Sequence, residues 1–215
     1  MRDNSQGKAL WDDRGPGSCE FVAAIFSCAM DKEKALKRIA HKITGCPLCK
    51  KGCTGKAVPG EGDPNARIVF IGEAPGSEEA KTGRPFVGRS GKFLRQMIKE
   101  AGLDENKVFI TSPVHYLPLR GTPSKEAIIH GRAHLFEQLS VVDPEIVVLL
   151  GKTACLAVLD AKVDITRAHG STIKKEGRTY CITFHPSYAM RFPEGKKQFI
   201  SDFKKLKRMF KSPSP

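Results

Sequence analysis

A glycine- and proline-rich stretch holds several residues that could do chemistry. It runs from Phe70 to Phe86 and reads FIGEAPGSEEAKTGRPF. Glycine lets a backbone approach a ligand closely, and proline fixes a turn. Glu73 could hold a water molecule or act as a base, although in a plain strand-to-helix turn it would be a solvated side chain. Phe86 could stack on a planar base or fill the core. The length of the pattern favours a loop that grips a ligand.

Two further motifs could carry reactive groups. In His185-Pro186-Ser187, the imidazole could donate to a developing anion or a carbonyl oxygen, or it could be packed in a turn. Gly151-Lys152-Thr153 is similar to the end of a phosphate-binding loop. That loop needs a glycine at position 146, where Ile146 stands, so we interpret the segment as the start of a helix.

The cysteines point to metal or redox chemistry more than to disulfides. The chain has seven, an odd number, and Cys46 and Cys49 form a C-x-x-C pair with Cys53 four residues further on. This spacing is typical of metal ligands, although loose thiols in a loop remain the alternative. Cys155 and Cys181 lie in apolar surroundings and are expected in the core.

Apolar runs alternate with amphipathic segments along the chain. This alternation predicts an α/β fold with a largely parallel sheet. Ligands bind such sheets beyond the carboxyl ends of the strands. The four predicted strands are followed in turn by GEAPG, by Ser112-Pro113-Val114-His115, by Gly151-Lys152-Thr153 and by His185-Pro186-Ser187, so we expect one site there. We expect strands over 66–72, 107–112, 145–151 and 178–184, the last in a hairpin around 176–177, and helices over 31–43, 89–102, 123–142, 152–160 and 196–210.

The charge indicates a polyanionic partner. The net charge is +13 and the isoelectric point about 9.5, which favours nucleic acid. Lysines gather at 50–56 and 196–207 and could track phosphates. No apolar run reaches 18 residues, so no membrane span is expected. Acidic residues precede the apolar segment 21–30, which disfavours a signal peptide and favours an intracellular, cytoplasmic location.

The chain divides into three parts by composition. We predict a poorly ordered N-terminal extension over 1–29, with Met30 as the natural start, one domain over 30–210 and a tail over 211–215.

The motifs taken together resemble a known family. GEAPGSEEAKTGRPFVGRSG, the His-Pro-Ser motif at 185–187 and the upstream CPLC followed by VPGEGDPNARIVF are similar to the type-4 uracil-DNA glycosylases over residues 41–210. The resemblance implies a three-layer α/β/α domain with a central, mostly parallel sheet. It also implies hydrolysis of the N-glycosidic bond of deoxyuridine in DNA, leaving an abasic site.

The resemblance assigns roles residue by residue. Glu73 would help to position the attacking water, and His185 would stabilise the uracil anion as it leaves. Phe86 would stack on the flipped base, which repays part of the cost of flipping. The backbone of Gly72, Glu73, Ala74, Pro75 and Gly76 would line the base pocket, and Ser90, Gly91, Lys92 and Ser187 would contact DNA.

The sequence departs from the family pattern in the pocket. Ser112 stands where the family has an asparagine that reads the uracil edge, and a hydroxyl cannot make the paired contacts of an amide. The pair Glu79-Ala80 replaces the Glu-Asp that closes the first motif.

The cysteines depart from the pattern as well. The family carries a 4Fe-4S cluster on four cysteines, and here only Cys46 and Cys49 match. The other two positions fall near Tyr116 and Gly131, with three histidines close by, namely His115, His130 and His134. The alternatives are loss of the cluster or another metal on mixed cysteine and histidine ligands, and the sequence favours the absence of an intact cluster.

We therefore expect a DNA glycosylase that acts as a monomer. We expect it to be monofunctional, without a lyase step, because no lysine nucleophile stands in the matched motifs. Two alternatives stay open. One is a glycosylase retuned to hypoxanthine or xanthine. The other is a catalytically weak relative that binds damaged or single-stranded DNA.

Overall fold

The computed structural model describes residues 19–211, with side chains described over 31–210. The predictions for residues 1–18 and 212–215 lie outside this range. The first helix, α1 (Cys19–Gly45), begins well before the predicted 31–43, inside the segment predicted to be an extension. No helix in the described range is long and apolar enough to cross a membrane.

The predicted apolar runs form the centre of a six-stranded sheet with the order β2-β4-β3-β6-β8-β7. Four neighbouring strands are parallel, and an antiparallel strand closes each edge. β3, β4 and β6 are buried along their whole length, as expected for parallel strands covered on both faces. The strands are β2 (Glu61–Gly62), β3 (Ile68–Ile71), β4 (Val108–Thr111), β6 (Ile146–Leu150), β7 (Thr172–Lys175) and β8 (Arg178–Thr183).

The expected hairpin joins β7 to β8. Its two turn residues, Glu176 and Gly177, have φ values of 53° and 75°. Positive φ at both positions is the conformation of a tight two-residue hairpin whose twist matches that of the strands. A separate pair of short strands, β1 (Cys53–Thr54) and β5 (Leu117–Pro118), lies outside the main sheet.

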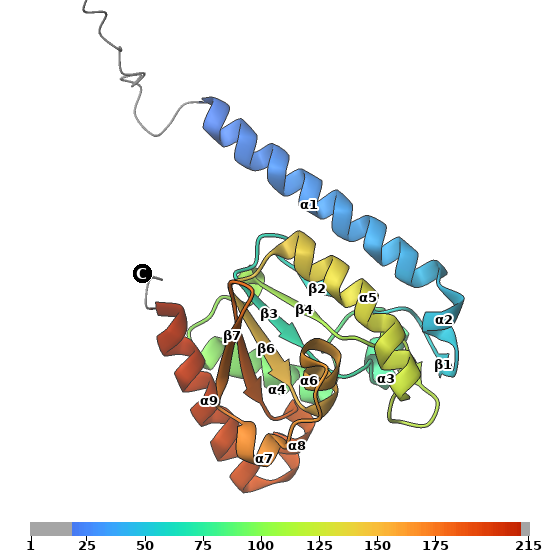
Figure 1. Ribbon diagram of the computed structural model, residues 1–215, viewed down its shortest axis with the longest axis vertical. Coiled ribbons are helices and arrows are strands. Elements are labelled where there is room, and N and C mark those ends of the chain that lie inside the picture. Colours follow the sequence, from blue (N-terminus) through green and yellow to red (C-terminus); the bar gives the residue numbers. More distant parts are fainter. Residues whose placement is uncertain (1–18, 212–215) are drawn as a thin grey trace, which may run out of the picture.

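Helices cover both faces of the sheet (Figure 1). Phe70 of β3 stacks on Phe203 of α9 (Pro193–Lys211), and Phe199 of α9 meets Phe93 of α4 (Arg89–Glu100). In the parallel register Phe70 pairs with Ile110, so the next residue, Thr111, points to the opposite face. There its hydroxyl donates to Gln138 of α5 (Lys125–Val142) at 2.7 Å.

The predicted three-layer α/β/α arrangement is therefore confirmed. α4 and α9 lie on one face of the sheet and α5 on the other, with α1 packed along α5 (Figure 1). The remaining helices are short: α2 (Pro47–Lys50), α3 (Ser77–Thr82), α6 (Lys152–Leu159), α7 (Ile165–Ala168), α8 (Pro186–Arg191) and the 3₁₀ turn Glu105–Lys107. α6 begins at Lys152, as expected, and the Ser124 side chain caps α5 by accepting from the backbone N–H of Ala127.

Candidate functional site

A cavity of about 200 Å³ lies at the carboxyl ends of three of the four parallel strands, β3, β4 and β8. The loop after β3, the first residue after β4 and the second residue after β8 all border it. The structure thus gathers most of the predicted base-pocket residues. Its lining includes Glu73, Ala74, Pro75, Gly76, Phe86, Ser90, Ser112 and His185.

The predicted DNA-contacting residues and Gly72 differ in how they lie relative to this cavity. Ser90 and Ser187 together border a second hollow next to it, between the starts of α4 and α8. Gly91 packs against the backbone of Phe86, where a Cβ would come within 2.1 Å of the Phe86 carbonyl. Gly72 lies behind the Phe86 ring, where a Cβ would come within 2.6 Å. Lys92 is exposed on α4 and borders neither hollow.

His185 presents one ring nitrogen for donation. Its Nδ1 accepts from the backbone N–H of Ser187 at 3.3 Å and lies 2.7 Å from the Ser187 hydroxyl. The neutral ring then carries its proton on Nε2. Burial lowers the pKa of His185, and the Glu73 carboxylate offsets part of that shift. A neutral imidazole with a free N–H therefore borders the cavity at physiological pH.

Glu73 has a partner that sequence reasoning missed. The buried Thr153 hydroxyl at the start of α6 donates to Glu73 Oε2 at 2.6 Å. This bond fixes one carboxylate oxygen and leaves the other as an acceptor. Thr153 follows the end of β6, and its place after a parallel strand was the only signal that could have revealed it.

Phe86 has a strained backbone that its surroundings hold. Its φ is 52°, a left-handed value that costs a non-glycine residue roughly 1 kcal/mol or more. Arg95 of α4 donates to the Phe86 carbonyl at 3.1 Å and to the Pro85 carbonyl at 3.0 Å. The ring is half-buried, and its centroid lies 6.3 Å from that of His185. Its stacking on a base remains a prediction.

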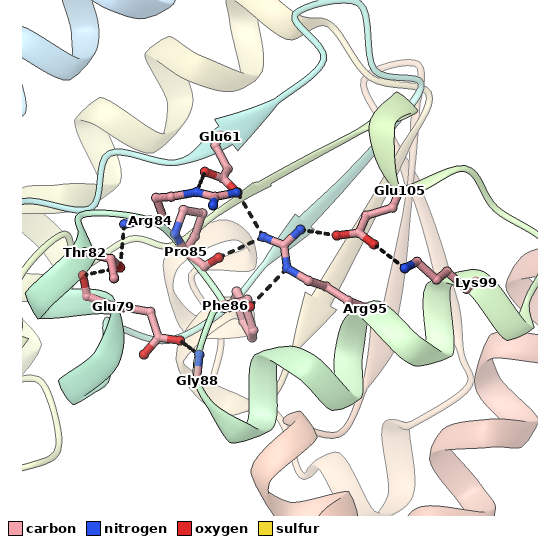
Figure 2. A network of polar contacts seen from close by, with 10 residues as sticks. All are labelled: Glu61, Glu79, Thr82, Arg84, Pro85, Phe86, Gly88, Arg95, Lys99 and Glu105. Carbon is pink, nitrogen blue, oxygen red and sulfur yellow. Dashed lines mark hydrogen bonds and ion pairs between the residues drawn. The ribbon is translucent and has the colours of Figure 1, made fainter.

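Arg95 is the centre of a charged network (Figure 2). Its guanidinium pairs with Glu61 at 2.9 Å and with Glu105, which Lys99 also contacts. The hydrogen bond from Arg95 lowers the pKa of Glu105. Burial tends to raise the pKa of Glu61, but hydrogen bonds from Arg84 and Arg95 outweigh it and hold that pKa below its ordinary value. Both carboxylates are therefore charged at neutral pH.

Glu79 ties the two ends of the same loop together. Its Oε2 accepts from the backbone N–H of Gly76 at 3.1 Å, and its Oε1 accepts from Gly88 at 2.7 Å, the second contact drawn in Figure 2. These two backbone groups precede α3 and α4. Glu79 is buried, so its carboxylate is a structural part of the loop.

Ser112 is buried, and its hydroxyl donates to the Val114 carbonyl at 2.8 Å. The single proton of the hydroxyl is thus used within the loop. Only its lone pairs remain for a ligand, which is an acceptor character unlike that of an amide.

A second group of reactive side chains lies apart from the cavity. Cys46, Cys49, His130 and His134 offer ligand atoms that all lie within 4.8 Å of one another, and none of the four lines the cavity. Cys53 and His115 do not belong to this group. Cys155 is buried as expected, whereas Cys181 is only partly buried.

The fold and the site together define an α/β protein with a ligand pocket at the carboxyl ends of a parallel sheet. Comparison with known proteins gives the family. The family described as the uracil DNA glycosylase superfamily matches residues 59–207. The chain belongs to this superfamily.

Several curated relatives cover most of the chain. It is 36% identical over 186 residues to the type-4 uracil-DNA glycosylase of Thermotoga maritima, covering 84% of this chain and 97% of the relative. It is 36% identical over 190 residues to the type-4 enzyme of Sulfurisphaera tokodaii, covering 83% and 86%. A type-5 uracil-DNA glycosylase of Pyrobaculum aerophilum is 29% identical over 188 residues, covering 78% and 81%.

Proposed function

We propose that this protein is a DNA repair glycosylase that hydrolyses the N-glycosidic bond of uracil in DNA and leaves an abasic site. The observation that carries the proposal is that Glu73, His185 and Phe86 line one cavity. The names of its relatives support uracil as the base. We further propose that it acts as a monomer on DNA inside the cell.

The proposed reaction divides the work between three side chains. The base leaves the duplex and stacks on Phe86. Glu73, held by Thr153, orients a water molecule toward C1′. The C1′–N1 bond breaks and its electron pair leaves with the uracil, while water gives its hydroxyl to C1′ and its proton to Glu73.

His185 acts on the leaving group. Negative charge grows on uracil O2 as the bond breaks, and a donor already fixed in place stabilises it without reorganisation. The Nε2–H of His185 is such a donor, since Nδ1 is held by Ser187. Because the ring is neutral, it donates without transferring its proton.

A retuned base preference is the second candidate, and Ser112 favours it. Its hydroxyl proton is bound to Val114, so the pocket lacks the donor of an amide at this position. Such a pocket would discriminate less strictly for the uracil edge.

Excision assays distinguish a uracil glycosylase from a glycosylase with another base preference and from a non-catalytic relative. Labelled oligonucleotides with one uracil, hypoxanthine or xanthine, single- and double-stranded, would be incubated with the protein and cleaved at abasic sites by alkali. We expect cleavage at uracil, and we expect Ser112→Asn to increase its rate. Cleavage only at another base would establish the retuned pocket. Tight binding without any cleavage would identify a non-catalytic relative, and an unchanged rate in Ser112→Asn would refute the role given to the missing amide.

A further inference from the structure

The C-x-x-C segment lies against the middle of α5. Cys46 is the residue before α2, and Cys49 is buried within that short helix. His130 and His134 are four residues apart on α5, so both point to the same side of the helix. Two segments more than 80 residues apart in the chain thereby contribute two thiols and two imidazoles to one point.

The contacts within this group suit a bound cation. Cys46 Sγ lies 3.2 Å from His130 Nε2. The His134 ring is edge-on to His130, with centroids 5.7 Å apart. His134 Nδ1 is buried without a hydrogen-bond partner among the described residues. A buried polar atom without a partner costs roughly 1–3 kcal/mol of stability, so we expect the four side chains around this nitrogen to bind a ligand such as a metal ion.

The donor set does not fit the iron–sulfur cluster that the family resemblance implies. Such a cluster is held by four cysteine thiolates, one on each iron. Here two of the four donors are imidazoles, and all four ligand atoms converge within 4.8 Å of one another. Convergence on one point suits a single ion.

The same donors fit zinc. Zinc binds Cys₂His₂ sets tetrahedrally, with bonds of about 2.3 Å to sulfur and about 2.0 Å to nitrogen. A sulfur and a nitrogen on one such ion lie roughly 3.5 Å apart. The distance from Cys46 to His130 is already close to this value.

We propose that Cys46, Cys49, His130 and His134 bind one zinc ion tetrahedrally, in place of an iron–sulfur cluster. The ion links α2, and through it the end of α1, to α5. It is a structural site, because none of its ligands borders the cavity of Glu73 and His185.

Metal analysis of the full-length protein tests this proposal directly. We expect about one equivalent of zinc per chain and neither iron nor acid-labile sulfide. Replacing the zinc by Co²⁺ should give the intense visible absorption of tetrahedral cobalt together with a thiolate-to-cobalt charge-transfer band. Iron with equimolar sulfide would overturn the proposal, as would a wild-type chain that binds neither zinc nor tetrahedral Co²⁺.

Matched variants test the ligands. Cys49→Ser and His134→Ala should each lower the zinc content at least tenfold. Cys53→Ser is the control, because this thiol is close in sequence but outside the group, and it should keep its zinc. The assignment is wrong if Cys53→Ser loses the ion or if His134→Ala and His130→Ala both retain it. The wild-type metal and cobalt measurements hold even where a variant fails to fold.

Discussion

The His185 side chain is both fixed in orientation and neutral, as a hydrogen-bond donor to a leaving anion needs to be. Its Nδ1 is fixed by the Ser187 backbone, and burial keeps the ring neutral. We expect His185→Ala to lower the single-turnover excision rate by about one to three orders of magnitude, because a fixed donor to the leaving anion is lost. Since the pKa of His185 is lowered, the loss should be the same at pH 7 and pH 8. A near-silent substitution would contradict the role of this imidazole.

Thr153 is a positioning residue, since it acts through Glu73. We expect Thr153→Val to lower the excision rate about tenfold, because the nearly isosteric side chain removes only the hydrogen bond to the carboxylate. Thr153→Ser keeps the hydroxyl and should restore most of the rate. DNA affinity, measured by fluorescence anisotropy, should be unchanged in both. Equal rates in the valine and serine variants would show that the bond does not matter.

The hydrogen bond between Glu73 and Thr153 is an example of a contact that the sequence alone does not predict. The two positions are 80 residues apart, and neither has a local pattern that names the other. The histidine ligands were easier to find. Their spacing of four within a predicted helix already places both on one side of it, although the sequence alone could not bring the C-x-x-C segment to that side.

At the scale of elements, the start of α4 and the loop before it form one unit. Arg95 joins them through two loop carbonyls and two carboxylates. We expect Arg95→Gln to lower the free energy of unfolding by roughly 1–3 kcal/mol, because charged groups lose hydrogen bonds. We also expect a slower excision rate, because the left-handed Phe86 is no longer held.

An exposed arginine is the control for Arg95. Arg167 pairs with Asp164 in an ion pair whose side chains are 90% and 61% exposed. Arg167→Gln should change stability by less than about 1 kcal/mol and leave excision unaffected. Denaturant unfolding and the oligonucleotide assay measure both effects. If Arg95→Gln unfolds with the wild-type midpoint, the network does not support the loop.

The helices and strands differ in how well their own sequences predict them. β6 is a run of five apolar residues and was predicted to within a residue at each end. β2 has only two residues, and its pairing with β4 depends on tertiary contacts rather than on a pattern of its own. α3 has six residues within the glycine-rich motif. It was not predicted, because the whole motif was interpreted as a ligand-binding loop.

At the scale of the whole molecule, the charge of +13 should dominate DNA affinity. For about four phosphate contacts, we expect the affinity for duplex DNA to fall by about two orders of magnitude between 50 and 200 mM salt. Lys92→Gln should reduce the slope of log affinity against log salt by about 1. Lys174→Gln, on the edge strand β7, should leave that slope unchanged. Equal slopes for all three proteins would remove Lys92 from the interface.

The edge strand β7 has a consequence for how copies of this chain behave toward one another. All four of its residues are exposed, and two of them are lysines. An unpaired strand edge is a template for another chain to extend the sheet, and neighbouring positive charges make that addition unfavourable. The lysines of β7 thus disfavour the addition of a strand from another copy, and we expect them to protect concentrated protein against edge-to-edge aggregation.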